Sequence, residues 1–383
     1  MLKLYHPRIA TYGLQVDDEF FVVDGGHAEF GTSTIPDFYR NYVGASSMDA
    51  LFLTHYHNHH LAGIPGIIRF FGGDVKHLYT PGIRPSKRHW PQEWADIRQM
   101  EALIDHYGIA YDHLHSGMTI QGHESALSLH AIHPHRDWIT IPGVTEEHPN
   151  GRCGLMLLVT YGKFRMLFTG DVHVFNDEHQ RRSHWENHVF KPLADILGDT
   201  KIHVVQVPHH GMGGVEHDWW IETLDADLYL LDGMPWNQAT MVDALNRCQR
   251  RFYSHFAVPQ AWVTGYLELH ANLDGTFHKQ RVDSSVRIEA PEQVPLGSDV
   301  PLTSYAYAVS RAPRRYEAYP QWPDHYPVER LEVVWELVAG SAHLIDCGHG
   351  SARLRPQTAG RMVVRAHAAH DPTKVGEVTI DVH

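Results

Sequence analysis

The sequence predicts an α/β domain followed by a smaller all-β domain. Strand-like segments alternate with helix-like segments over residues 1–284, a pattern typical of α/β folds. From residue 285 the chain changes to short alternating strands separated by Gly and Pro turns, with no helical pattern between them. These features predict an immunoglobulin-like β-sandwich over residues 285–383. A chain of 383 residues is also too long for one ordinary hydrophobic core.

The first predicted strands are short apolar runs that end in turns or polar clusters. The run Phe20–Val23 closes with Asp24-Gly25-Gly26, as a buried strand does when it enters a tight turn. Residues 48–54 form a second such strand, which leads directly into the histidine-rich segment 55–60. Apolar residues at helical spacing then predict a helix over residues 61–71.

The rest of the chain follows the same logic. An amphipathic helix is predicted over residues 94–107. A hairpin over 154–160 and 163–169 ends in Gly170-Asp171, and a buried strand over 201–207 ends in Pro208-His209-His210-Gly211. Further strands are predicted over residues 126–133, 227–231, 260–264, 285–291, 331–338, 342–346, 361–367 and 377–382.

Composition excludes several classes of protein. The chain is 43% hydrophobic and 20% charged, which excludes a disordered or coiled-coil protein. No apolar run approaches the roughly 18 residues of a membrane span, and no secretory signal begins the sequence. The sparse, odd set Cys153, Cys248 and Cys347 fits a reducing compartment, so we expect a cytoplasmic protein. A net charge of −13 opposes general binding to duplex DNA.

Ligand-type residues gather at three predicted strand ends. Among 33 dispersed histidines, only clusters with ligand spacing indicate chemistry. His55 and His57 lie two residues apart, so in extended chain they point the same way and can chelate one ion. His59 and His60 can reach a second ion, and Asp171 can bridge the two. A water between two such ions loses a proton near neutral pH and becomes a nucleophile.

These motifs resemble those of the metallo-β-lactamase superfamily. The first metal motif of that family is His-x-His-x-Asp-His at a strand end, and here residues 55–60 read His-Tyr-His-Asn-His-His. Asp24-Gly25-Gly26, Gly170-Asp171 and residues 207–211 (VPHHG) match its other strand-end motifs in order. Within the superfamily the strings AIHP at 131–134 and LMLLVTYGKFRMLFTGD at 155–171 are most similar to the metallo-hydrolase domain of competence DNA-internalisation proteins.

The resemblance implies a four-layer αββα fold and a site for one or two metal ions, most often Zn²⁺, with Mn²⁺ or Fe²⁺ as alternatives. Asp24 would orient a metal-binding histidine, and His209 would donate to an oxyanion or phosphate of the substrate. Asp171 and His209 are therefore the expected catalytic residues. The expected metal ligands are His55, His57, His59, His60, Asp171 and His210.

The sequence departs from the family pattern at two places. His59 replaces a carboxylate, which should make the bound water more acidic but hold the second ion less tightly. The third-motif histidine is not evident, and Asn150 and Cys153 stand in that region. Cys153 is either a thiolate ligand or a small core residue. His133, which precedes Pro134, is expected to be structural.

Three functions remain open at this stage. The first is a metal-dependent hydrolase of nuclease or phosphodiesterase type that cleaves a small-molecule or nucleotide phosphodiester. The second is an ester, lactone or amide hydrolase on the same site, because fold does not fix substrate. The third is a catalytically decayed binding or scaffold protein. In each case we expect the β-sandwich to pack against the first domain, or to mediate homo-oligomer or protein contacts.

Overall fold

The computed structural model describes the whole chain except residues 9, 33, 124, 137–144, 147–153, 173–177, 199, 213, 234–237, 255–266, 280–284, 310–324 and 370. The chain divides into two compact units, one of Met1–Gly233 with Thr264–Gln280 and one of Met234–Val263 with Arg281–His383. The second unit thus takes in residues 234–263, which the predicted boundary at 284 assigns to the first domain. The boundary itself stays a prediction.

The first sheet of the first unit is mixed, with the strand order β17–β16–β1–β2–β3–β4–β5–β7. Neighbours from β17 to β3 pair antiparallel, whereas β3, β4, β5 and β7 pair in parallel. The strands are β1 (Leu2–Arg8), β2 (Thr11–Val16), β3 (Glu19–Val23), β4 (Ala50–Phe52), β5 (His77–Thr80), β7 (Ala110–His113), β16 (Leu267–Ala271) and β17 (Phe277–Lys279).

The second sheet of this unit is also mixed and runs in the order β14–β13–β12–β11–β9–β8. β8, β9, β11 and β12 pair antiparallel, and β12, β13 and β14 pair in parallel. The strands are β8 (Thr119–Gln121), β9 (Leu127–His133), β11 (Met156–Tyr161), β12 (Phe164–Phe168), β13 (Val204–Gln206) and β14 (Leu228–Leu231). A small parallel pair joins β6 (Arg84–Pro85) to β10 (Thr145–Glu146).

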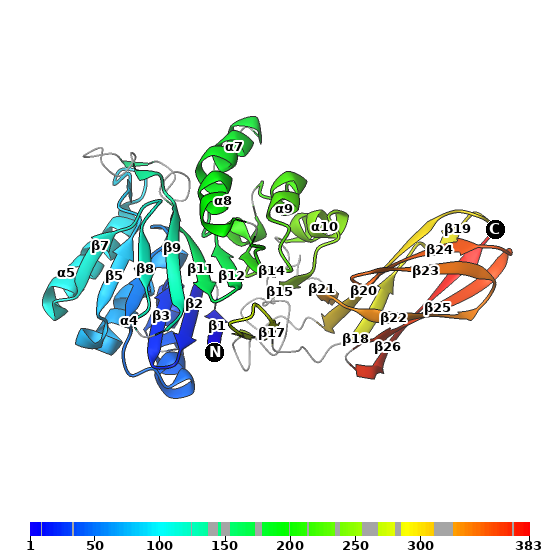
Figure 1. Cartoon of the computed structure of the whole chain (residues 1–383), viewed down its shortest axis with the longest axis horizontal. Coiled ribbons are helices and arrows are strands. Elements are labelled where there is room, and N and C mark those ends of the chain that lie inside the picture. The colour runs from blue at the N-terminus through cyan, green and yellow to red at the C-terminus, as the bar shows by residue number, and fades with distance from the viewer. Residues whose placement is uncertain are drawn as a thin grey trace. The chain divides into compact units, whose positions relative to one another are not determined.

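The two sheets lie between helices (Figure 1). Ring centroids of Tyr12 on β2 and Phe168 on β12 are 5.0 Å apart, so the sheets contact each other. α4 (Ile64–Phe71) and α5 (Pro91–Tyr107) share a hydrophobic core with the first sheet. On the second sheet, the Trp220 ring of α9 (Asp218–Leu224) lies 5.9 Å from that of Tyr229 on β14. This arrangement is an α/β fold with two mixed sheets between helices.

Shorter helical segments complete the first unit. They are α1 (Ala28–Gly31), α2 (Thr34–Asp37), the π-helical η1 (Phe38–Val43), α3 (Asn58–Leu61), η2 (Gly72–Asp74), α7 (Glu178–Trp185), the π-helical η3 (Glu186–Phe190), α8 (Lys191–Leu197) and the 3₁₀ turn η4 (Pro208–Gly211). None of the described helices is long and apolar enough to cross a membrane.

Parallel strands of both sheets deliver polar side chains at their carboxyl ends. Asp24 follows β3 directly, and His55 comes three residues after β4. In the second sheet Asp171 comes three residues after β12, and His210 lies in the turn after β13. A rigid sheet that ends in irregular loops is a common way to position functional groups.

The second unit is built mainly from antiparallel strands. β18 (Ser285–Glu289), β20 (Val300–Val309), β21 (His325–Arg330), β23 (Ala342–Gly348) and β24 (Ser351–Pro356) belong to one sheet, and β19 (Gln293–Val294), β22 (Val333–Ala339), β25 (Gly360–Ala368) and β26 (Asp371–Val382) form another. α10 (Ala239–Arg247) and β15 (Phe252–Ser254) also lie in this unit.

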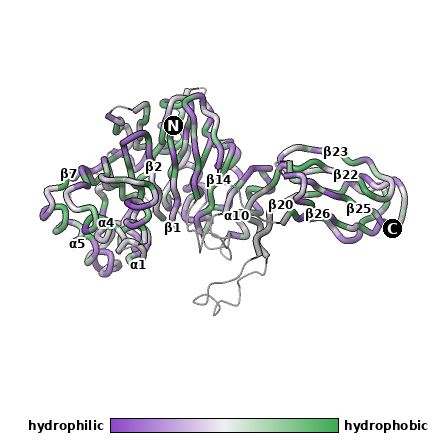
Figure 2. The backbone as a smooth tube through the Cα atoms, turned by 90° about the horizontal axis from the view of Figure 1, so that it is seen from below, coloured by the Kyte–Doolittle hydropathy of each residue, from purple (hydrophilic) through white to green (hydrophobic). Residues whose placement is uncertain are grey.

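The two C-terminal sheets share one hydrophobic core. Leu302 and Leu354 from the first of them pack in the same cluster as Val364 and Ile380 from the second. Along β25 buried residues alternate with more exposed ones, and hydrophobic and hydrophilic residues alternate along the tube (Figure 2). The described strands therefore form packed β-sheets, as expected for a sandwich. An immunoglobulin-like topology stays a prediction.

Candidate metal centre

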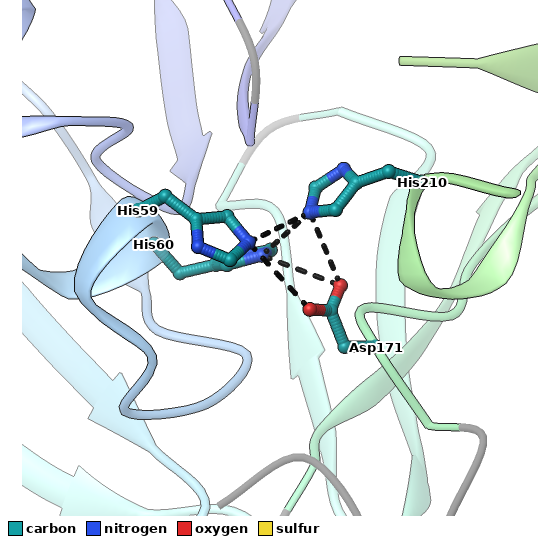
Figure 3. A group of neighbouring side chains, drawn as sticks. All are labelled: His59, His60, Asp171 and His210. Carbon is teal, nitrogen blue, oxygen red and sulfur yellow. Dashed lines mark hydrogen bonds and ion pairs between the residues drawn. The ribbon is translucent and has the colours of Figure 1, made fainter. Parts of the chain in front are cut away.

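Five histidines from distant parts of the sequence converge on the carboxylate of Asp171. They fall into two groups that share this residue, each with its ligand atoms within 4.8 Å of one another. One group is His55, His57 and Asp171, and the other is His59, His60, Asp171 and His210 (Figure 3 shows the second). All five histidines and Asp171 were expected ligands, and the structure brings every one of them together.

Asp171 lies at the centre because the chain turns sharply after β12. Gly170 has a φ of +51°, a conformation that favours glycine, and a Cβ there would lie only 3.1 Å from Cβ of Thr54. The turn directs the Asp171 side chain, which is fully buried, between the two sheets. One carboxylate can therefore face the histidines that follow β4 and the histidine that follows β13 at the same time.

The first group places two imidazoles on one carboxylate oxygen. Nε2 of His55 lies 3.3 Å from Oδ2 of Asp171, and Nδ1 of His57 lies 3.7 Å from the same oxygen. His55 is fully buried, whereas His57 is partly exposed and has its ring 5.0 Å from that of Trp90. The two-residue spacing thus acts as expected, with both rings directed to one point.

Two histidines of the second group lie next to the other carboxylate oxygen, Oδ1, whereas Nε2 of His59 lies 3.7 Å from Oδ2. Nε2 of His60 and Nε2 of His210 lie 3.3 and 3.4 Å from Oδ1 of Asp171, and 3.2 Å from each other. Nε2 of His59 lies 2.9 Å from Nε2 of His210. His59 therefore occupies the ligand position where the family pattern has an aspartate, and it directs a ring nitrogen into the same space.

A hydrogen-bond network at the carboxyl ends of β3 and β4 fixes the ring of His60. Oδ2 of Asp24 accepts from Nδ1 of His60 at 2.8 Å and from Oγ1 of Thr54 at 2.6 Å. Oδ1 of Asp24 accepts from the backbone N–H of Thr54 at 2.6 Å. Because the Thr54 hydroxyl donates to Asp24, it can accept from Nδ1 of His55, 3.1 Å away. Both histidines then present Nε2 lone pairs to the site.

A second carboxylate, Asp232, does for His210 what Asp24 does for His60, and sequence reasoning missed it. Oδ1 of Asp232 lies 2.9 Å from Nδ1 of His210, and Oδ2 accepts from the Tyr12 hydroxyl at 2.6 Å. Asp232 directly follows the buried strand β14 and precedes Gly233. The same strand, Asp and Gly order marks Asp24, so that pattern was the available signal.

The charges of the centre depend on each other. Burial opposes ionisation of Asp171, but the facing histidines, His60 and His210 first, outweigh it and hold its pKa well below the usual range. Burial, with a smaller contribution from the neighbouring His60, lowers the pKa of His59 to about 3. The Asp171 carboxylate and the neutral His59 imidazole are the protonation states that bind metal.

The donor set fits a divalent metal. Within the described residues, the buried Nε2 of His55 and Nδ1 of His57 have no hydrogen-bond partner. Two ligands at about 2.0–2.1 Å from one tetrahedral Zn²⁺ lie roughly 3.3 Å apart, close to the separations of His60, His210 and Asp171. Imidazoles with one carboxylate suit Zn²⁺ and other first-row metals better than Mg²⁺ or Ca²⁺. The described residues therefore contain a His/Asp cluster that could hold a divalent transition metal.

The other expected site residues lie apart from this donor set. His209 belongs to neither metal group, and its Nδ1 donates to the backbone oxygen of Met212 at 2.9 Å. Its positive φ of 48° belongs to the turn that directs His210 inward. Asn150 and Cys153 of the third-motif region lie outside the described residues.

Comparisons with known proteins return distant likenesses only. No protein-family model and no curated protein matches the chain. A mutant of the β-hydroxylase CmlA aligns at 12% identity with a TM-score of 0.38, over 64% of this chain and 48% of that one, about half its length. A subclass B3 metallo-β-lactamase from a soil metagenome library aligns at 14% identity with a TM-score of 0.34, over 64% of this chain and 88% of that one. Zn²⁺-bound PqqB from Methylobacterium extorquens aligns at 11% identity with a TM-score of 0.30, over 51% of this chain and 58% of that one.

Proposed function

We propose that this protein is a metal-dependent hydrolase whose preferred substrate is a phosphodiester. The observation that carries the hydrolase assignment is the position of the buried Asp171 carboxylate, which two groups of histidines share. Two divalent cations held there would supply Lewis acidity and an activated water. The metal type we propose is Zn²⁺, with Mn²⁺ or Fe²⁺ as alternatives.

The chain's own residues would prepare this chemistry. Asp24 and Asp232 hold the rings of His60 and His210 so that the Nε2 lone pairs converge. His57 and His59 are the partly exposed members of the cluster, with 19% and 23% of their side chains accessible. Substrate would therefore approach from their side, because the other ligands are buried.

The phosphodiester class rests on the resemblance of the sequence motifs to competence-type hydrolases and on His209, whose ring lies 6.4 Å from that of the ligand His210. His209 follows the same strand as His210, and its Nδ1 bond to Met212 fixes the ring. A histidine next to a cation site suits an anionic substrate.

The test is cleavage of bis(p-nitrophenyl) phosphate by metal-loaded protein. We expect turnover with Zn²⁺, Mn²⁺ or Fe²⁺ that falls at least about 100-fold in His57→Ala, because one ion loses a ligand. His106→Ala, on the exposed side of α5, is the matched control and should keep full activity.

Two other outcomes would change the proposed substrate class or contradict the hydrolase function. Turnover of p-nitrophenyl acetate or a lactone, without any phosphodiester cleavage, would replace the substrate class and keep the metallo-hydrolase. Purified protein that binds none of the three metals would contradict the hydrolase and support a scaffold.

A further inference from the structure

A second group of histidines lies outside the Asp171 centre. Nε2 of His133, at the end of β9, lies 3.0 Å from Nε2 of His184 in α7. The ring of His184 lies 5.1 Å from that of His188, which in turn lies 5.2 Å from that of His135. None of these four belongs to the groups around Asp171.

The spacing of these histidines is that of chelating pairs. His184 and His188 are four residues apart across the junction of α7 and the π-helical η3, so their side chains project from the same face. His133 and His135 are two residues apart at a strand end, the spacing that His55 and His57 also have. Because β9 runs in the same direction as β12, His133 lies at the sheet edge that also carries Asp171.

The tautomer of His133 decides what the group can bind. Its Nδ1 donates to the backbone oxygen of Gly154, which leaves the Nε2 lone pair directed at His184. A neutral imidazole in this tautomer accepts and cannot donate from Nε2, so it suits a cation and not a phosphate or carboxylate. Two nitrogens 3.0 Å apart also match neighbouring ligands of one transition-metal ion.

We propose that His133, His184 and His188 form a second metal site, which takes one Zn²⁺-class transition-metal ion independently of the Asp171 centre. His133 and His184 are the inner ligands, with 0% and 9% exposure. His188 is the third ligand: its ring lies 5.1 Å from that of His184 and would rotate to bring a nitrogen to the ion, because the three rings do not form a closed ligand set without it. A site made only of imidazoles selects Zn²⁺, Ni²⁺ or Cu²⁺ over Mg²⁺ and Ca²⁺.

Protonation supports this assignment. Burial lowers the pKa of His133 to about 4, against a weaker opposing effect of the Gly154 carbonyl. Burial also lowers the pKa of His188, with a further contribution from His135. Both imidazoles are therefore neutral near pH 7, the form that coordinates metal.

The experiment counts metal ions in the full chain. Metal-free protein is loaded with Zn²⁺, freed of excess by gel filtration and analysed for zinc, with Co²⁺ absorption as a second readout. The variants are His184→Gln and the less buried His188→Gln, with His106→Gln as the matched control. Each is also made together with Asp171→Asn, which removes the carboxylate shared by the main centre.

We expect His184→Gln to lose one zinc per chain in both backgrounds and the control to lose none. His188→Gln should raise the Kd of this ion by at least about 100-fold. Loss of a ligand costs more than loss of a residue that only hydrogen-bonds to a ligand, which typically costs about 10- to 100-fold. Asp171→Asn alone should still bind this one ion. Equal zinc content in the wild type and in folded His184→Gln and His188→Gln would overturn the proposal. Loss of phosphodiester cleavage alone would bear on the proposed function and not on this site.

Discussion

Asp232 accepts a hydrogen bond from His210, with Oδ1 of the carboxylate 2.9 Å from Nδ1 of the ring. Its other oxygen accepts from Tyr12, so one buried chain of hydrogen bonds links β2 of the first sheet to the metal group of the second. Burial opposes the charge on Asp232, but His210 outweighs it and lowers the pKa to about 2. The ligand His210 is therefore held by a permanent negative charge near neutral pH.

Asp232→Asn should weaken metal binding without unfolding the protein. The amide can still accept from Nδ1 of His210, but it no longer carries the charge that makes the ring a stronger ligand. We expect the Kd of the ion in the group of His59, His60 and His210 to rise by about 10- to 100-fold, as measured by competition with a chromogenic chelator.

Asp227→Asn provides the control for this prediction. Asp227 precedes the same strand, β14, but its carboxylate pairs with Lys201 at the surface, 2.8 Å away. It should bind metal like the wild type. An unchanged Kd in Asp232→Asn would mean that the carboxylate only contributes to packing.

His59→Asp should tighten the binding of the second ion. His59 is a neutral donor next to His210, and a carboxylate would add one negative charge at the same position. Coulombic attraction at this range, even at an effective dielectric near 20, predicts at least about a tenfold lower Kd. Elemental analysis of both proteins after dialysis against a weak chelator measures the difference. His106→Asp controls for net charge, and equal zinc retention in all three proteins would show that His59 does not limit the second site.

The sequence predicts the strand ends of the centre well because each has a local signature. A buried apolar run followed by a polar cluster or a glycine turn marks Asp24, the histidines at 55–60, Asp171 and His210. Asp232 has the same signature, but nothing local tells that β14 lies beside β13. Pairing of distant strands is a tertiary property, so its partner His210 could not be read from the sequence.

The first two strands of the first sheet are also absent from the sequence-based prediction, for a related reason. The first 18 residues alternate polar and apolar side chains, yet we assigned them no strand, and they form β1 and β2. β1 lies between β2 and β16, strands that are more than 250 residues apart in the chain. That long-range pairing buries residues such as Leu4 and Leu14, and it positions Tyr12 next to Asp232.

Gly63→Ala should displace His60 through the backbone. A Cβ on Gly63 would lie 1.9 Å from the backbone oxygen of Gly25, and this contact sets how the segment after the histidines packs on the turn at Asp24. We expect a loss of roughly 1–3 kcal/mol in unfolding free energy and weaker metal binding. Gly73→Ala is the control, because a Cβ there meets nothing within 4 Å. Urea unfolding with metal titration checks both, and a Gly63→Ala protein with wild-type stability would contradict the packing argument.

His133 should make the metal-free protein less stable as the pH falls from about 6.5 to 4. Burial holds its pKa at about 4, whereas in the unfolded chain it is roughly 6.5. In this window the unfolded state binds a proton that the folded state does not, so the free energy of unfolding decreases by up to about 3 kcal/mol. Above about pH 6.5 both states are neutral and the effect is absent.

His133→Asn isolates this contribution, because the asparagine amide can still donate to the Gly154 oxygen but does not titrate. Other buried histidines, His55 and His59 among them, add a similar slope to both proteins and cancel in the difference. Urea unfolding is measured with a chelator present, at pH 7 and pH 4.5. The unfolding free energy of the variant, relative to that of the wild type, should increase by about 2 kcal/mol from pH 7 to pH 4.5. Parallel pH profiles would mean that His133 is protonated in the folded state, which would also count against its Nε2 lone pair as a metal ligand.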